Sequence, residues 1–258
     1  MSFRVVIPAR YASVRLPGKP LRVIAGRAMI EHVHARATLA GASEVIVATD
    51  DERIARACRA FGAEVALTDP KHPSGTDRLA EVALARGWAK DAIVVNVQGD
   101  EPLMPPRIVA QVASLLAATP GAALATLATP IASLEELLDP NIVKVVTAPG
   151  GRALYFSRAP VPWQRDATAR GEQGLGRHAL AQRHIGLYAY RVSTLATLAA
   201  LAPTPLEMAE RLEQLRALES GLVIAVATAV EIPGPGVDTE ADLRSVERLI
   251  GAQGARRQ

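Results

Sequence analysis

The first half of the chain alternates continuous apolar runs with segments in which apolar residues recur every three or four positions. Continuous runs predict buried strands, and the longer spacing predicts amphipathic helices. The strands are predicted at 3–8, 43–50, 63–68 and 92–98, and the helices at 28–40, 51–61, 76–88 and 105–118. Buried strands separated by helices indicate an α/β fold, with a mostly parallel sheet covered by helices on both faces.

The pattern changes in the second half, where strand-like runs follow one another without a clear helix between them. A polar loop is predicted at 164–176. The other predicted elements are strands at 123–131, 143–149, 153–157, 184–192 and 222–230, and helices at 206–221 and 239–252. We expect a single domain over residues 1–258, in which about 130–205 form an antiparallel excursion that could serve as a dimer surface.

The composition is that of an ordinary globular protein, with 49% hydrophobic and 21% charged residues among 258. The formal net charge of +3 is too small to indicate general nucleic-acid binding, so an anion site would need a local cluster of cations. Cys58 is the single cysteine, which excludes a disulfide within the chain. No run of about 18 apolar residues and no signal-peptide pattern occurs, so we expect a soluble cytoplasmic protein without a membrane segment.

A basic loop follows the first predicted strand and carries Arg10, Arg15 and Lys19, with no acidic residue before Glu31. Neither the glycine-rich dinucleotide pattern nor a P-loop is present, so phosphates would be gripped mainly by side chains. Ligands of open α/β sheets bind beyond the carboxyl ends of the strands, where Arg10 lies. The three cations therefore predict a triphosphate site, although a solvated basic loop has the same composition.

Candidate metal-binding acids follow the apolar strand predicted at 92–98. They lie in the sequence Gln98-Gly99-Asp100-Glu101-Pro102. Asp100 is well placed to hold Mg²⁺ on nucleotide phosphates, although these residues also favour an ordinary turn. Asp238 is a second candidate. Alternatively, Asp238 or Thr239 caps the last helix.

Further candidates lie at the start of the helix predicted at 76–88. Ser74 and Gly75 offer a hydroxyl and backbone N–H groups to an anion. Arg78 in the first turn opposes the helix dipole, which favours a ligand contact over simple pairing with Asp77. His184 shares a strand face with Tyr188, a pattern that is more often structural than catalytic.

Taken together, the motifs resemble those of the CMP-KDO synthetases, the 3-deoxy-manno-octulosonate cytidylyltransferases. They are, in order, IPARYAS, RLPGKPL, VATD, SGT-RLAE, VVNVQGDEP, ALYFSRAPVPW, HIGLYAYR, PLE--E-LEQLR and PG-GVDTEADL, and they span Phe3 to about Ile250. The resemblance implies a Rossmann-like nucleotide-diphospho-sugar transferase fold and a homodimer. It also implies an Mg²⁺-dependent enzyme that converts CTP and KDO to CMP-KDO and pyrophosphate for lipopolysaccharide biosynthesis.

The resemblance also implies residue roles. The catalytic residues implied are Arg10, Arg15, Lys19, Asp100 and Asp238, of which Asp100 and Asp238 would bind the metal. The nucleotide would contact Pro8, Ala9, Arg10, Arg15, Lys19, Ser74, Gly75, Arg78 and Gln98. The sugar would contact Arg158, Arg165, His184, Tyr188, Glu213 and Gln214. The arginine- and glycine-rich loop at 164–183 departs from the family pattern.

Two alternatives remain open from the sequence alone. One is another sugar nucleotidyltransferase that uses a different base or sugar. The other is an inactive nucleotide-binding module on the same fold. The presence of Lys19 together with Asp100 and Asp238 favours an active enzyme.

Overall fold

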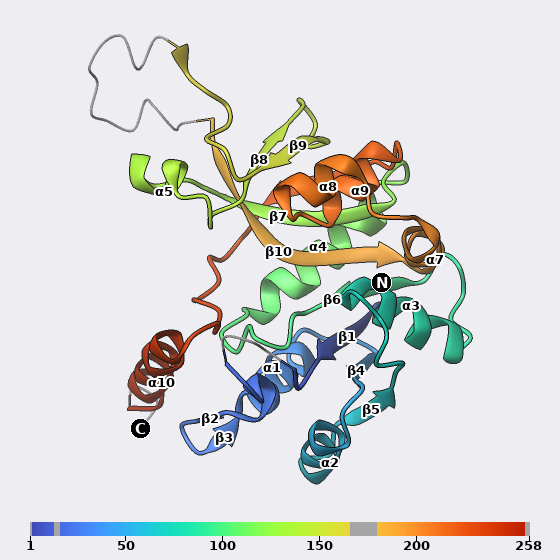
Figure 1. Ribbon diagram of the computed structural model, residues 1–258, viewed down its shortest axis with the longest axis vertical. Coiled ribbons are helices and arrows are strands. Elements are labelled where there is room, and N and C mark those ends of the chain that lie inside the picture. Colours follow the sequence, from blue (N-terminus) through green and yellow to red (C-terminus); the bar gives the residue numbers. More distant parts are fainter. Residues whose placement is uncertain (1, 13–15, 166–179, 256–258) are drawn as a thin grey trace.

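The computed structural model of the chain describes residues 2–12, 16–165 and 180–255, and its main element is a twisted sheet (Figure 1). The strand order along the sheet is β11-β7-β10-β6-β1-β4-β5. These strands are β1 (Arg4–Ala9), β4 (Glu44–Thr49), β5 (Glu64–Leu67), β6 (Ile93–Asn96), β7 (Leu124–Pro130), β10 (Gln182–Arg191) and β11 (Ile224–Thr228). All of them run in one direction except β10, which is antiparallel to both β6 and β7. The predicted α/β fold with a mostly parallel sheet is confirmed.

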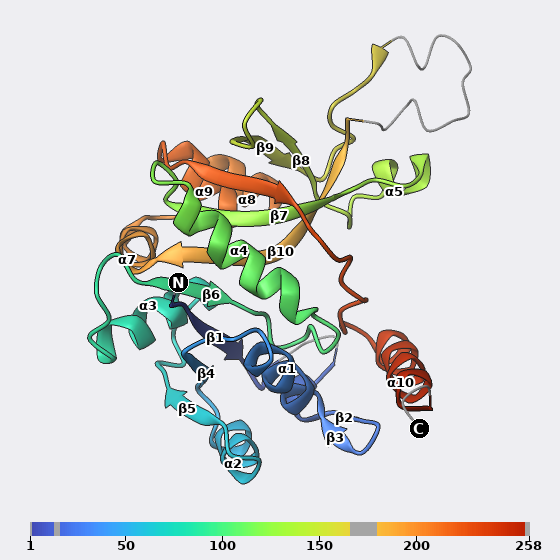
Figure 2. The same ribbon diagram turned by 180° about the vertical axis from the view of Figure 1, so that it is seen from behind.

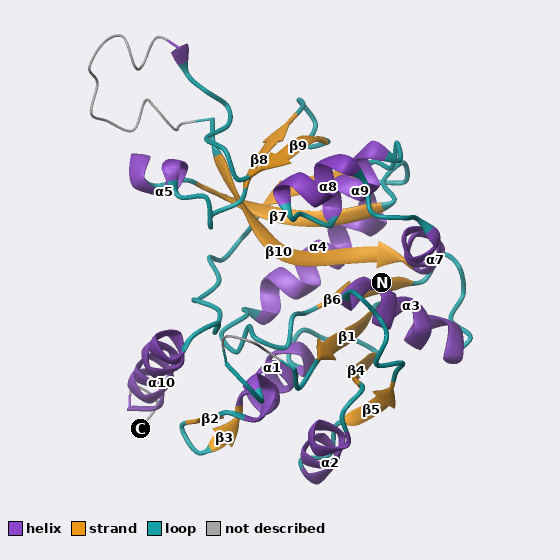
Figure 3. Cartoon of the chain, in the orientation of Figure 1, coloured by secondary structure: helices purple, strands orange, loops and turns teal. Residues whose placement is uncertain are grey.

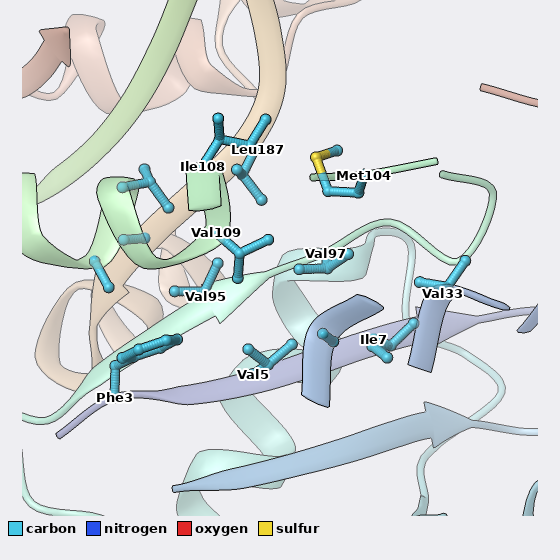
Figure 4. Close-up of a cluster of buried hydrophobic side chains, with 14 of the residues drawn as sticks. Phe3, Val5, Ile7, Val33, Val95, Val97, Met104, Ile108, Val109 and Leu187 are labelled. Carbon is cyan, nitrogen blue, oxygen red and sulfur yellow. The ribbon is translucent and has the colours of Figure 1, made fainter. Parts of the chain in front are cut away.

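Helices cover both faces of this sheet, because successive residues of a buried strand point to opposite sides. On one face, Val5 and Ile7 of β1 pack with α1 (Met29–Thr38), α2 (Glu52–Ala60) and α4 (Pro106–Ala118), as Figure 4 shows for part of this cluster. On the other face, Val6 packs with α3 (Gly75–Ala85), α7 (Val192–Ala200) and α9 (Gln214–Glu219). Figures 1 and 2 show α4 and α9 on opposite sides of the sheet.

Within the range of about 130–205 predicted as an antiparallel excursion, β8 (Lys144–Thr147) and β9 (Ala153–Ser157) form an antiparallel pair beside the main path of the sheet, with the short helix α5 (Leu134–Leu138) nearby (Figure 3). Strand β8 pairs with the start of β10, so β10 joins this pair to the central sheet. The predicted polar loop at 164–176 falls largely outside the described residues. Within the described ranges, no helix has the length and apolar character needed to cross a membrane.

The last helix, α10 (Glu240–Ala255), packs beside the small hairpin of β2 (Val23–Ile24) and β3 (Arg27–Ala28) (Figures 1 and 2). Its Leu243 and Val246 join a separate apolar cluster that includes Ile24 and Leu16. Leu16 precedes the short 3-10 helix η1 (Lys19–Leu21). This cluster therefore holds the C-terminal helix against the basic loop near the N-terminus.

The prediction of one helix over 206–221 is wrong. Two short helices, α8 (Pro205–Glu210) and α9, are separated by Arg211, whose φ of 55° is left-handed. Glu207 on α8 accepts two hydrogen bonds from the guanidinium of Arg216 on α9, at 2.8 and 2.6 Å. This bidentate pair offsets the strain of the break and holds α8 beside α9. The sequence interpretation also missed α7, α5 and the small hairpin.

Arg78 is a fully buried cation that ties α3 to the carboxyl end of β4. Its guanidinium pairs with Asp50 and also donates to the hydroxyl of Thr68. The arginine side chain is 0% exposed and that of Asp50 is 16% exposed, so both charges depend on each other for solvation.

We expect Asp50→Ala to destabilise the fold by about 3 kcal/mol or more, because it leaves a buried charge without its partner. Glu44→Ala is the matched control. It removes an ion pair with Arg4 at the start of the same strand, where both side chains are partly exposed, and should cost less than about 1 kcal/mol. Chemical denaturation measures both values. Equal losses in the two variants would contradict the role given to burial.

His184 lies in a row of aromatic side chains on β10. Its ring centroid is 5.1 Å from that of Phe156 and 5.3 Å from that of Tyr188. Burial lowers the pKa of His184 to about 3, so its imidazole is neutral at neutral pH.

Because an unfolded histidine binds a proton below about pH 6.5, the unfolded state gains stability as the pH falls through that value. Folding stability should therefore drop on acidification, and His184 should contribute about 2 kcal/mol of the loss between pH 7.5 and 5. His184→Phe keeps a ring of similar size but cannot titrate. Denaturation curves across this range should show a shallower pH dependence in the variant, and parallel slopes would refute the assignment.

Candidate active site

A cavity of about 230 Å³ opens at the carboxyl ends of β1 and β6, and we call it the basic cavity. Since these are adjacent parallel strands, their ends meet at one edge of the sheet, where open α/β folds bind ligands. Its lining residues are Pro8, Arg10, Ala12, Lys19, Pro20, Gly75, Gln98, Gly99 and Asp100.

Close backbone approach shapes this cavity. A Cβ atom at Gly99 would lie 2.9 Å from the carbonyl oxygen of Pro8, and one at Gly75 would lie 3.3 Å from the Pro8 ring. The two glycines therefore allow the loop after β6 and the start of α3 to pack against the end of β1. Arg10 donates to the carbonyl of Pro73 at 2.9 Å, which ties the segment before α3 to the same edge.

Lys19 lies between two carboxylates at the mouth of the basic cavity. Its Nζ is 2.6 Å from Oδ2 of Asp100 and 3.0 Å from Oδ1 of Asp238. Burial alone would lower the pKa of this lysine, but the two carboxylates outweigh burial and raise it. The ammonium group is therefore charged and brings together the two acids that the sequence placed 138 residues apart.

The segment that follows β11 delivers Asp238 to this point. Val237 donates its backbone N–H to the carbonyl of Asp100 at 2.9 Å. A Cβ atom at Gly234 would lie 2.7 Å from Cβ of Leu103, so the chain passes too close to the β6 loop for a side chain there.

The sequence left open whether Asp238 caps the last helix, and the structure gives that role to Thr239. The Thr239 hydroxyl accepts from the N–H of Asp242 at 3.2 Å, and the Asp242 carboxylate accepts from the N–H of Thr239 at 2.9 Å. This is a reciprocal capping box. The carboxylate of Asp238 is directed to Lys19 instead.

A third acid, Glu101, lies beside this pair and was not singled out from the sequence, although it directly follows Asp100. Burial, followed by the negative charges of Asp100 and Asp238, raises the pKa of Glu101 to about 8. Glu101 is therefore largely protonated at pH 7, and the negative charge around the Lys19 ammonium group is that of Asp100 and Asp238. Two carboxylates and the oxygens of a bound phosphate are ligands that suit Mg²⁺, so the donor set fits this ion. Across the described residues, no group of three or more His, Cys, Asp or Glu forms a metal site from protein ligands alone.

A second cavity, of about 360 Å³, adjoins the first, and Gln98 lines both. We call it the polar cavity. Four residues predicted to contact a sugar line it, namely His184, Tyr188, Glu213 and Gln214. The hydroxyl of Tyr188 and the amide nitrogen of Gln214 are buried and make no hydrogen bond within the described part of the chain. Buried polar groups of this kind are suited to a ligand rich in hydroxyl groups.

Several predicted site residues do not line either cavity. Ala9 is buried in the core, and Arg78 pairs with Asp50. Ser74 caps α3 and also donates to Glu213 at 3.1 Å. Arg158 donates to the carbonyls of Glu210 and Pro140, at 2.7 and 2.9 Å. Arg165 is exposed outside both linings, and Arg15 lies outside the described residues.

The sequence analysis did not predict several other residues that line the polar cavity. The clearest are Asn96, Asn141, Arg183 and Tyr190. Two signals were present in the sequence: Asn96 interrupts an apolar strand, and Tyr190 continues the alternation begun by Tyr188.

Known proteins are similar to this chain over most of its length. The family model described as cytidylyltransferase matches residues 4–227. Among curated relatives, 3-deoxy-manno-octulosonate cytidylyltransferase of Thioalkalivibrio sulfidiphilus is 56% identical over 98% of this chain and all of that protein. The protein of the same name from Halorhodospira halophila is 55% identical, over 96% of this chain and 97% of its own length.

Two solved structures of cytidylyl-transferring enzymes are similar to this chain. A CMP:2-keto-3-deoxy-manno-octonic acid synthetase in complex with CTP superposes with a TM-score of 0.88 at 42% identity, covering 98% of this chain and all of that one. A cytidylyltransferase from Leptospira borgpetersenii, at 15% identity and a TM-score of 0.63, shares the fold and covers 98% of this chain and 87% of its own. From the family match and the full-length relatives, the chain belongs to the cytidylyltransferases, in the group of 3-deoxy-manno-octulosonate cytidylyltransferases.

Proposed function

We propose that this enzyme transfers CMP from CTP to the anomeric hydroxyl of KDO, giving CMP-KDO and pyrophosphate in an Mg²⁺-dependent reaction. The observation that carries the proposal is the contact between the two cavities at Gln98. One cavity is lined by cations suited to a triphosphate, and the other by polar groups suited to a sugar. A reaction between two bound substrates needs this adjacency.

The chemistry is a displacement at phosphorus. The anomeric oxygen of the sugar forms a bond to the α-phosphorus, the bond from the α-phosphorus to the bridging oxygen breaks and releases pyrophosphate, and the hydroxyl proton passes to water. Such a reaction depends mainly on positioning and on neutralising the charge of the phosphates. Arg10 and Lys19 line the basic cavity and supply that charge, and Arg15 is proposed to join them.

Asp100 and Asp238 would hold the Mg²⁺ ion. When bound, the ion would polarise phosphate oxygens and lower the pKa of the attacking hydroxyl. Lys19 keeps the two carboxylates together, since both accept from its ammonium group. The cation-binding pair is therefore preorganised by the same lysine that is proposed to neutralise the phosphates.

The polar cavity is proposed to hold the sugar acid. Tyr188, Gln214 and Glu213 would hydrogen-bond its hydroxyl groups, and neutral His184 would add one donor or acceptor. For Arg158, the contacts with two backbone carbonyls support a positioning role beside Asn141.

Family likeness supports three further proposals. The enzyme would act in the cytoplasm, supply lipopolysaccharide biosynthesis, and form a homodimer through residues about 130–205. The apolar side chains of Leu138, Leu154 and Trp163 are exposed on this part of the chain, in agreement with a covered surface.

The substrate assignment is tested by pyrophosphate release and product analysis, with CTP or UTP paired with KDO or sialic acid. We expect turnover with CTP and KDO in the presence of Mg²⁺ and its loss when the metal is chelated, because the phosphate charge would no longer be neutralised. Faster turnover with UTP, or with sialic acid, would assign the enzyme to another nucleotidyltransferase reaction.

The roles of the acids are tested by Asp100→Ala and Asp238→Ala. Each should lower kcat by about 100-fold or more, the usual cost of removing one electrostatic contact made in the transition state. Lys19→Ala should also lower kcat. Asp91→Ala is the control, because Asp91 is an exposed acid just before β6, away from both cavities. Wild-type turnover in either acid variant would remove that residue from the mechanism.

A further inference from the structure

The polar cavity has an unusual distribution of charge. Its ionisable lining residues, within the described chain, are Arg183, His184, Glu213 and Arg216, together with Tyr188 and Tyr190. Burial lowers the pKa of His184, so its imidazole carries no charge at neutral pH. Both arginines therefore need to be considered as partners for an anionic group of the substrate.

Arg216 donates its hydrogen bonds to other groups of the protein. Its Nε and one terminal nitrogen donate to the two carboxylate oxygens of Glu207, and the other terminal nitrogen donates to the carbonyl of Leu201 at 3.2 Å. This arginine holds α8 and α9 together, so its donors are used.

Arg183 differs from Arg216 in its exposure and in its partners. Its side chain is exposed, and its guanidinium makes no hydrogen bond or ion pair with another described residue. Arg183 is the second residue of β10. Because β10 runs antiparallel to β6, the start of β10 lies at the edge of the sheet where β6 ends and Asp100 and Glu101 follow. Arg183 therefore lies at the edge of the sheet where the reaction is proposed to occur.

The structure of the proposed sugar substrate determines where its carboxylate must bind. In a 2-keto sugar acid, the carboxylate is attached to the anomeric carbon, which also bears the attacking hydroxyl. A group that binds the carboxylate must therefore lie close to the reacting oxygen and not at the far end of the sugar. A planar guanidinium binds a carboxylate through two parallel hydrogen bonds.

We propose that Arg183 binds the carboxylate of the sugar acid and is the residue that selects an acidic sugar as acceptor. This inference rests on the proposed function. It assigns the carboxylate contact to an arginine at the cavity instead of Arg158, whose guanidinium donates to the carbonyls of Glu210 and Pro140.

The test combines a change in the enzyme with the matching change in the substrate. Pyrophosphate release is measured for the wild type and Arg183→Met, each with KDO and with its carboxamide, which has no charge. Losing one charge-assisted contact should lower kcat/KM by about 10- to 100-fold. We expect this loss for the wild type with the carboxamide and for the variant with KDO, but little further loss when both changes are combined.

Arg183→Lys should recover part of the preference for KDO over the carboxamide, because it restores a charge without the planar fork. The Kd for CTP should stay within about twofold of the wild type, a readout that a general structural defect would change. If the Arg183→Met variant does not fold, the same measurements are made on Arg183→Gln. Arg191→Met is the matched control, since Arg191 ends the same strand and lines neither cavity.

An Arg183 variant that prefers KDO over the carboxamide as strongly as the wild type does would overturn the inference and leave the proposed function intact. Wild-type enzyme that releases no pyrophosphate from CTP and KDO would instead overturn the proposed function, and the inference with it.

Discussion

The ammonium group of Lys19 is shared by the carboxylates of Asp100 and Asp238, residues that lie 81 and 219 positions further along the chain. Each of the three groups comes from a different segment, so the contact requires three independent loops to meet at one edge of the sheet. The loop after β6 meets the end of β1 because Gly99 has no side chain, and the C-terminal segment meets the β6 loop because Gly234 has none. The charge arrangement thus depends on backbone packing.

One ammonium group does not balance the acids around it. Glu101 adds a third carboxyl, and its raised pKa reflects both burial and the charges of Asp100 and Asp238. A cation bound among these acids would reduce their mutual repulsion, and Arg10, which also lines the basic cavity, would be available to the phosphates. The proposed metal–nucleotide complex presents positive and negative charge side by side, and this arrangement of acids and cations would suit it.

Sequence patterns predicted the parts of the fold that depend on local periodicity. The strands and helices of the first half were found because a buried strand is a continuous apolar run and a covering helix repeats every three or four residues. The break at Arg211 was missed because no glycine or proline marks it, and it depends on the Glu207–Arg216 pair, which forms only in the folded chain. The partner of Arg78 was likewise not predictable from local spacing, since Arg78 is on α3 and Asp50 follows β4, 28 residues earlier in the chain.

The relation between the two cavities follows from the one antiparallel strand in the central path. Strand β10 lies between β7 and β6, with Tyr188 directly opposite Asn96. Asn96 accepts a hydrogen bond from Gln98, and Gln98 lies two residues before Asp100, at the junction of the two cavities. The register of β10 against β6 thus fixes the distance between the polar cavity and the acids. A slip of one residue would turn Tyr188 to the opposite face, so strand pairing in the core sets where a second substrate can meet the first.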